Sequence, residues 1–221
     1  EFQGGAERSR RRGRVGETAL SDSPLANVVV VLDHPKDLVN IAGVIRVMMN
    51  FGIPSLRLVN PDEFDGWRIG GIAHRSEHIV EAATIHDTLA DAVSDVSFIV
   101  GTTARARTAG RAYVRPREAA ERVSERLKEG KVAILMGRED RGLTNEGLDL
   151  CHAVTIIPTD PDYSSLNLAQ AFLVLGYEMF MAADGGEDEL PVGRRATRPP
   201  TQEELETTFE VIEAGLGRIE F

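Results

Sequence analysis

The chain has 221 residues, of which 42% are hydrophobic, and its formal net charge is −10. This length suffices for one α/β core with appendages, no apolar run approaches the ~20 residues of a membrane span, and nothing resembles a signal peptide. The single cysteine, Cys151, excludes an internal disulfide and a cysteine-rich zinc site, fits a reducing cytoplasm, and is expected to be a small buried residue.

The first 23 residues lack hydrophobic periodicity and are rich in Arg, Gly and Ser, which predicts a disordered basic arm. The absence of an initial Met indicates a processed or engineered start. A second arginine-rich segment, residues 102–117, contains no carboxylate. Together these segments could form a phosphate-binding face on an acidic body, and the alternative is a solvated charged loop.

A βαβ unit follows the arm. Residues 27–32 (NVVVVL) form a β-branched run that is typical of a strand buried on both faces. We predict a helix that is capped by Asn40 and ends at Gly52, and then a strand over residues 55–60. The connection should be a right-handed crossover.

The middle of the chain continues the alternation of strands and helices. We predict a helix around residues 67–74, a short strand near 79–82 and a helix around 86–93. Buried strands are expected at 97–101 and 132–136, with a helix between them that begins at Pro116, continues through Leu127 and closes at Gly130.

Residues 154–179 connect a last strand, 154–157, to a helix through a polar loop. The apolar residues expected on one face of this helix are Leu166, Ala169, Leu173, Gly176, Tyr177 and Phe180. The helix N-terminus would present free backbone N–H groups to a ligand.

These elements predict an α/β domain over residues 24–183 with a mostly parallel sheet. Ligands bind beyond the carboxyl ends of the strands in such sheets. The polar loops 101–104, 137–143 and 158–167 each follow a predicted strand, so we expect them to face one another.

The C-terminal part differs in composition. Residues 184–200 are predicted to be a linker, and Thr201 with Glu204 forms a capping box that starts an amphipathic helix over 201–221. Its expected apolar face contains Leu205, Phe209, Ile212 and Leu216. The apolar pattern of this helix continues to the last residue, which indicates a shortened C-terminus or packing on a partner subunit.

Common catalytic and nucleotide-binding motifs are missing from the sequence. There is no GxxxxGK[ST] loop, no well-placed GxGxxG and no GxSxG elbow. His74 and His78 have i,i+4 spacing but lack a third ligand signature, so structural or surface histidines are favoured and no metal is expected.

Three segments together resemble a known family. They are Asn40-Ile-Ala-Gly-Val-Ile-Arg46, Gly137-Arg-Glu-Asp-Arg-Gly142 with the following LTNE, and Ile157-Pro158 with Ser164-Ser-Leu-Asn167. In this order they resemble the motifs of the SPOUT superfamily, and more narrowly its SpoU/TrmH-type RNA 2′-O-ribose methyltransferases. The phrases GTTARAR, GREDRGLTNEGLDLC and PDYSSLNLAQA are most similar to the TrmJ tRNA methyltransferase branch.

The resemblance implies a deep C-terminal trefoil knot (the SPOUT α/β knot), a homodimer and S-adenosyl-L-methionine as cofactor. The cofactor-binding residues that it implies are Thr102, Thr103, Ala104, Gly137, Ile157, Ser164, Ser165 and Leu166. On chemical grounds, Ile157 and Leu166 could wall an apolar slot for adenine, and Gly137 could allow a close backbone approach.

The resemblance also implies the catalytic residues Arg46, Asn40 and Glu139. Because the pKa of an arginine lies above ~12, Arg46 either orients the ribose hydroxyl and its phosphate or acts as a base only when perturbed. Asn40 would support the loop, and Glu139 would position Arg46 or the partner chain. Asn167 is either a helix cap or a ligand contact. The arginine-rich loop would bind RNA through Arg105, Arg107 and Arg111.

The sequence departs from the family pattern beside the catalytic motif. Where relatives have Asn-x-Gly, this chain has Ala42, with Gly43 one position later, and Val39 stands where glycine is frequent. The hypothesis is metal-free methylation of a ribose 2′-hydroxyl in tRNA, at the pyrimidine of position 32 in the anticodon loop. The alternatives are methylation of ribosomal RNA, or an inactive RNA-binding protein.

Overall fold

A computed structural model describes residues 23–104, 111–183 and 200–218. Contacts divide the chain into two units, Glu1–Glu187 and Asp188–Phe221. The predicted basic arm and linker, together with Arg105 and Arg107, lie outside the described residues. Within the described ranges, no helix has both the length and the apolar character needed to cross a membrane.

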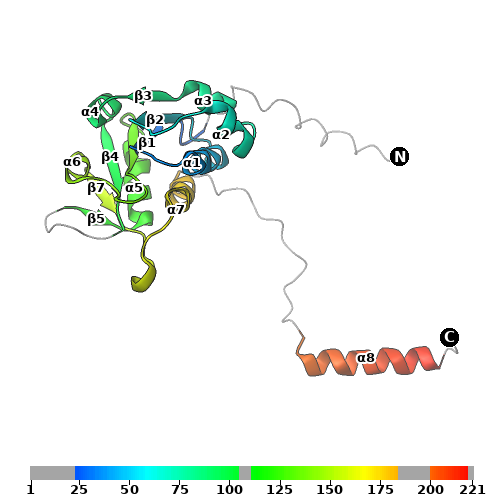
Figure 1. Ribbon diagram of the computed structural model, residues 1–221. Helices are drawn as coiled ribbons and strands as arrows, with labels where there is room; N and C mark the ends of the chain where they lie inside the picture. Colours follow the sequence, from blue (N-terminus) through cyan, green and yellow to red (C-terminus); the bar gives the residue numbers. More distant parts are fainter. Residues whose placement is uncertain (1–22, 105–110, 184–199, 219–221) are drawn as a thin grey trace, which may run out of the picture. The chain divides into compact units, whose positions relative to one another are not determined.

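The first unit is built on a seven-stranded sheet in the order β3-β2-β1-β6-β4-β7-β5 (Figure 1), and all neighbouring strands run parallel. The strands are β1 (Val28–Asp33), β2 (Ser55–Val59), β3 (Thr84–His86), β4 (Phe98–Thr102), β5 (Tyr113–Val114), β6 (Val132–Met136) and β7 (Ala153–Thr155). The predicted α/β class with a parallel sheet is therefore confirmed.

Helices cover both faces of this sheet. The helices of the first unit are α1 (Leu38–Phe51), α2 (Gly66–Ile72), α3 (Glu77–Ala82), α4 (Leu89–Ala92), α5 (Pro116–Arg126), α6 (Asn145–Asp149) and α7 (Leu168–Ala182), with a 3₁₀ turn η1 (Pro161–Tyr163). One core cluster combines α1, α2, α3, α5 and α7 with one face of the sheet, and a second combines α4 and α6 with the other face. Both faces are buried, which explains the continuous apolar strands.

The start of α1 differs from the prediction. Asp37, not Asn40, is the N-cap: its backbone is extended and its side chain accepts a hydrogen bond from the N–H of Val39. The helix therefore begins two residues before Asn40, whose side chain is free for tertiary contacts. The predicted end is confirmed, because Gly52 has the left-handed φ of 66° that a glycine cap provides.

One further prediction needs correction, and two short elements were not predicted. The strand expected near 79–82 is helix α3, and the strand of this region is β3 at Thr84–His86. The two-residue strand β5 and the five-residue helix α6 were not predicted, because neither is long enough to show periodicity.

The buried face of helix α7 matches the predicted apolar face only in part. Its buried residues are Leu168, Phe172, Leu175, Gly176 and Met179, and the predicted Ala169 and Phe180 are partly buried against the core. Leu173 and Tyr177, which were predicted on the same face, are exposed. Helices α1 and α7 lie side by side (Figure 1), and a Cβ on Gly43 would lie 2.8 Å from the Cβ of Ala169. The displaced glycine of the first motif thus permits close packing of these two helices.

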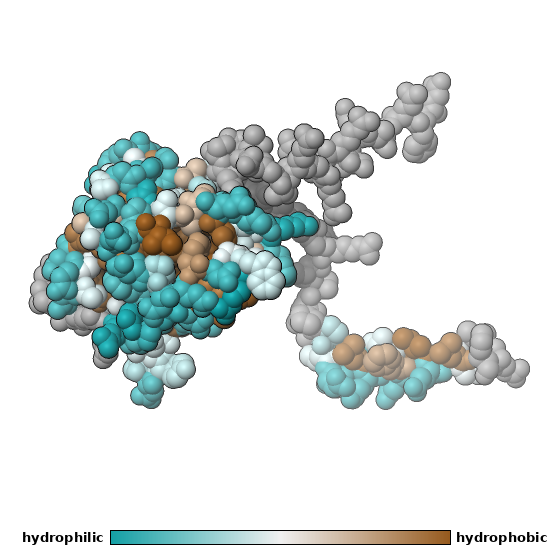
Figure 2. Space-filling model, turned by 45° about the horizontal axis from the view of Figure 1, so that its top comes forward, coloured by the Kyte–Doolittle hydropathy of each residue, from teal (hydrophilic) through white to brown (hydrophobic). Residues whose placement is uncertain are grey.

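The second unit contains helix α8 (Gln202–Gly217). Its predicted capping box is confirmed, with hydrogen bonds between Thr201 and Glu204 in both directions. The predicted apolar residues gather on one side of the helix (Figure 2), and Leu205, Phe209, Ile212 and Leu216 are all exposed.

Candidate active site

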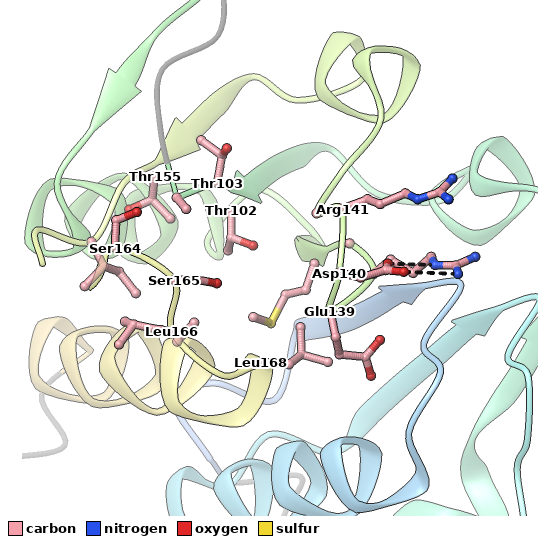
Figure 3. Close-up of a pocket in the computed structure, with 17 residues that line it drawn as sticks. Thr102, Thr103, Glu139, Asp140, Arg141, Thr155, Ser164, Ser165, Leu166 and Leu168 are labelled. Atoms are coloured by element: carbon pink, nitrogen blue, oxygen red, sulfur yellow. Dashed lines mark hydrogen bonds and ion pairs between the residues drawn. The ribbon is translucent and has the colours of Figure 1, made fainter. Parts of the chain in front are cut away.

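One cavity of about 250 Å³ lies at the carboxyl ends of β4, β6 and β7. The parallel pairs Gly101↔Leu135 and Gly101↔Val154 bring these three strand ends to the same edge of the sheet. Figure 3 shows Thr102, Thr103 and Thr155 along one wall, with Ser164, Ser165 and Leu166 across from them. The predicted convergence of the three polar loops is confirmed.

All eight residues that the sequence assigned to a cofactor line this cavity. They are Thr102, Thr103, Ala104, Gly137, Ile157, Ser164, Ser165 and Leu166. Met136, Leu168 and Ala171 add apolar surface, and residues 138–142 form the remaining rim. A small apolar chamber with hydroxyl groups on its walls suits a small polar molecule that carries a flat ring.

The close backbone approach predicted at Gly137 is found within its own loop. A Cβ on this residue would lie 2.2 Å from the backbone carbon of Gly142 and 2.2 Å from the nitrogen of Leu143. The loop folds back on itself through a bridge between Arg138 and Gly142, whose φ is 67°. The glycine therefore serves the closure of its own loop, and this closure shapes the rim of the cavity.

Thr155 is a lining residue that the sequence analysis missed. It is 1% exposed, and its Oγ1 has no hydrogen-bond partner among the described residues. It lies within the predicted last strand, next to the third polar loop, and the structure pairs it with Thr102. A buried hydroxyl without a partner is costly and is usually satisfied by a ligand or water.

Glu139 joins the cavity rim to the start of α1. Its carboxylate accepts hydrogen bonds from the backbone N–H groups of Lys36 (3.0 Å) and Asp37 (3.2 Å) and from Nδ2 of Asn40 (3.0 Å). Burial raises the pKa of Glu139, but the hydrogen bonds from Asn40 and from the backbone outweigh burial, so the pKa lies below its ordinary value. The carboxylate is therefore ionised and anchors the first turn of α1.

Asn40 extends this connection to the third loop. Its Oδ1 accepts a hydrogen bond of 2.6 Å from Nδ2 of Asn167. Asn167 in turn caps α7, accepting hydrogen bonds from the N–H groups of Ala169 and Gln170. Of the two roles considered for Asn167, the structure shows the helix cap. One chain of side chains, Glu139–Asn40–Asn167, thus links all three motifs.

Ion pairs fix the outer rim of the cavity. The carboxylate of Asp140 lies 3.0 Å from Nε of Arg138 and 3.2 Å from Nζ of Lys36. Hydrogen bonds from Arg138 and Lys36 lower the pKa of Asp140 to about 2. In this part of the rim, the negative charge of Asp140 is thus neutralised by Arg138 and Lys36.

Arg46 does not line the cavity in the described chain. It lies on the exposed side of α1, six residues after Asn40 and hence about 9 Å farther along the helix axis. Its guanidinium donates a hydrogen bond of 3.4 Å to the carbonyl of Ile72. Among the described residues, Arg46 is therefore not part of the cavity wall, and Glu139 contacts the first turn of α1 rather than Arg46.

Two other predicted residues are also placed. The guanidinium of Arg111 pairs with Asp149 at 2.8 Å, and its side chain is only 17% exposed, so this arginine holds β5 against α6 rather than facing solvent. Cys151 is mostly buried as expected, and its thiol donates a hydrogen bond to the carbonyl of Gly147. Burial raises the pKa of Cys151 to about 12, so the thiol is unreactive.

Comparison with known proteins identifies a methylase family and related enzymes. Residues 27–177 match the SpoU rRNA Methylase family. A tRNA (cytidine/uridine-2′-O-)-methyltransferase TrmJ of Yersinia pestis (strain Pestoides F) is 35% identical over 199 residues, which cover 89% of this chain and 77% of the relative. A tRNA (cytidine/uridine/adenosine-2′-O-)-methyltransferase TrmJ of Pseudomonas aeruginosa (strain UCBPP-PA14) is 42% identical over 156 residues, covering 70% of this chain and 60% of the relative.

A solved structure shares the fold. The crystal structure of TrmJ from Z. mobilis ZM4 superposes with a TM-score of 0.65 at 32% identity, covering 86% of this chain and 79% of the other. The chain has a parallel sheet with three motifs around one cavity, and it is similar to these enzymes in sequence. It is therefore an RNA methyltransferase. Within that class, the chain belongs to the SpoU methylase family.

Proposed function

We propose that the protein transfers a methyl group from S-adenosyl-L-methionine to a ribose 2′-hydroxyl of tRNA, at the pyrimidine of position 32 in the anticodon loop. The observation that carries the proposal is the convergence of the three motifs on one cavity. The relatives named as tRNA 2′-O-methyltransferases support the substrate and the position of methylation on the ribose.

The cavity fits the proposed cofactor. Ile157 and Leu166 offer apolar walls for adenine. Thr102, Ser164 and Ser165 also line the cavity, and their hydroxyls would form hydrogen bonds with polar groups of the cofactor. The Oγ1 of Thr155 is a further polar atom at this site, and it has no hydrogen-bond partner within the part of the chain that the structure describes. When bound, the cofactor supplies an activated methyl group on a sulfonium, so the protein has to orient the ribose and handle one proton.

We propose that the linked side chains of Glu139, Asn40 and Asn167 act by positioning helix α1. It fixes the first turn of α1 against the cavity rim and against the cap of α7. Arg46 lies on the same helix, and we assign it the role of orienting the ribose and its phosphate. A guanidinium, with a pKa above ~12, is a poor proton acceptor but an effective phosphate ligand.

We further propose the knotted homodimer that the sequence implied. The supporting observation is an exposed apolar face on α1 and α7, which contains Val39, Leu173, Tyr177 and Met181. Arg46 shares the exposed side of α1 with Val39. A second copy that covered this face would bring the Arg46 of each subunit into the interface. The dimer would thus explain why Arg46 lies away from the cavity of its own chain.

The test uses labelled cofactor with total tRNA and with ribosomal RNA as separate substrates. We expect the label in tRNA, as a 2′-O-methyl group at position 32. The variant Arg46→Ala should lose turnover but retain cofactor binding. Label in ribosomal RNA alone would select the first alternative. Calorimetry that showed no cofactor binding by the wild-type protein would favour the inactive RNA-binding protein.

A further inference from the structure

Helix α2 carries an indole that is almost entirely open to solvent. Trp67, in the first turn of α2, is 87% exposed, the highest value among the large hydrophobic side chains that the structure describes. Within residues 60–83, all of which are described, no other large hydrophobic side chain is exposed. The centre of a protein interface needs several apolar side chains together. A single indole among polar residues is suited instead to stacking on a flat ring.

The helix face beside the indole is open. Gly70 and Gly71 follow Trp67 by three and four residues, so they lie on the same face of α2. A Cβ on either glycine would have nothing within 4 Å. Glycine weakens a helix relative to alanine, and no contact within the described part of the chain requires it here. The two glycines thus leave room for a flat group that stacks on Trp67.

Two arginines lie at the other end of α2. The guanidinium of Arg46 donates to the carbonyl of Ile72, the last residue of α2, at 3.4 Å. Arg75 is exposed in the turn that follows, with a left-handed φ of 66° that is uncommon for a residue other than glycine. Neither arginine forms an ion pair with a described residue, whereas Arg68 pairs with Glu63. Their positive charges are therefore available to an anionic ligand.

An aromatic ring and arginines at this spacing suit a single strand of nucleic acid. Trp67 and Ile72 are separated by five residues, which is about 7.5 Å along the helix axis. Unpaired bases stack on exposed aromatic rings because every base has a π-face, and basic side chains nearby hold the phosphates of the same strand. Helix α2 packs against α1 (Figure 1), so the strand would lie beside Arg46.

We propose that Trp67 stacks on an unpaired base of the substrate RNA, close to the nucleotide that Arg46 orients, while Arg75 binds an adjoining phosphate. The indole thereby favours a single-stranded loop over base-paired RNA near the methylated ribose, because a base within a duplex is already stacked on its neighbours. This inference rests on the proposed function, since it takes RNA as the ligand.

Fluorescence tests the stacking directly. Trp67 is the only tryptophan of the chain, so the tryptophan emission reports on this side chain alone. Total tRNA added to the wild-type protein should quench the emission and shield it from iodide, whereas a fully paired RNA duplex should do neither. Binding of tRNA that leaves the emission unchanged would overturn the proposal. Emission that depends on protein concentration without RNA would also overturn it, because a second copy would then cover Trp67.

Three variants separate stacking from a general loss of apolar surface. Trp67→Ala should weaken tRNA binding about 5- to 150-fold in a filter assay, whereas Trp67→Phe, which keeps a ring, should stay within about threefold of wild type. Ile85→Ala is the matched control, because it removes another exposed hydrophobic side chain, from the edge strand β3, and should bind tRNA like the wild type. Wild-type affinity in Trp67→Ala, or an equal loss in either other variant, would overturn the assignment.

Failure of this inference is distinguishable from failure of the proposed function. A wild-type protein whose emission is quenched by tRNA, but which methylates no RNA, would refute the proposed function alone. A wild-type protein that methylates tRNA, while Trp67→Ala binds tRNA equally well, would refute the role of Trp67 alone.

Discussion

Replacement of Glu139 by glutamine is the sharpest perturbation that the site offers. The substitution preserves size but exchanges one carboxylate oxygen for an NH₂ group. Oε1 accepts from Asp37 N and Asn40 Nδ2, and Oε2 accepts from Lys36 N at 3.0 Å. An amide nitrogen in place of Oε2 cannot accept the Lys36 N–H, which keeps only its longer contact of 3.3 Å to Oε1, and the hydrogen bonds to Oε1 lose the charge that strengthens them.

The expected cost follows from these contacts. A hydrogen bond to a charged group contributes about 1.5–3 kcal/mol, and water at this partly exposed site recovers part of the loss. We expect Glu139→Gln to lower the free energy of unfolding by about 1–2 kcal/mol, which corresponds to a melting temperature lower by about 2–8 °C for a domain of this size. Thermal unfolding measures the effect, and calorimetry should show weaker cofactor binding because the rim loop is released from α1.

The matched control is Glu118→Gln on α5. Glu118 pairs with Arg122 at 2.7 Å in an exposed i,i+4 arrangement, so its loss should cost no more than about 0.5 kcal/mol. If Glu139→Gln unfolds at the same temperature as Glu118→Gln, the carboxylate does not anchor α1. The reasoning about the linked motifs would then be wrong.

Three other predictions concern the same region. Gly137→Ala places a Cβ 2.2 Å from the backbone of Gly142, so urea unfolding should show a loss of about 3 kcal/mol or more, and a change under 1 kcal/mol would contradict the close approach. Arg138 lowers the pKa of Asp140 from 3.8 to about 2, so the stability that this carboxylate adds is present above pH 4 and lost as the pH falls towards 2. The difference in urea midpoint between wild type and Asp140→Asn should shrink accordingly. Because burial raises the pKa of Cys151 to about 12, iodoacetamide at pH 8 should alkylate it slowly in the native protein and rapidly in urea; equal rates would refute this.

Local patterns were sufficient where burial on both faces or a cap decides the structure. The β-branched run of β1 and the apolar run of β6 identified central strands, because only a strand covered on both sides is apolar throughout. Gly52 marked a helix end because glycine adopts a left-handed φ readily, and the capping box marked the start of α8 through the side-chain hydrogen bonds of Thr201 and Glu204. The three motifs were sufficient to select eight residues of the cavity wall, but not Thr155.

Local sequence patterns failed where several helix faces or caps were equally compatible with the sequence and a contact between distant residues determined which one is used. Helix α7 is apolar on most sides, and its packing against Gly43 of α1 decides which side is buried. Asn40 is as good a cap as Asp37 in sequence, but it is engaged by Glu139, 99 residues away.

The sequence alone thus determined the parallel α/β class, the family and eight of the residues around the cavity, because strand burial, helix caps and motifs depend on residues that are close together in sequence. Only the tertiary structure decided that Gly137 serves its own loop, that Arg111 is held by Asp149, and that Arg46 lies away from the cavity of its own chain. Each of these outcomes depends on distances between segments that are far apart in sequence, and no local pattern encodes such a distance.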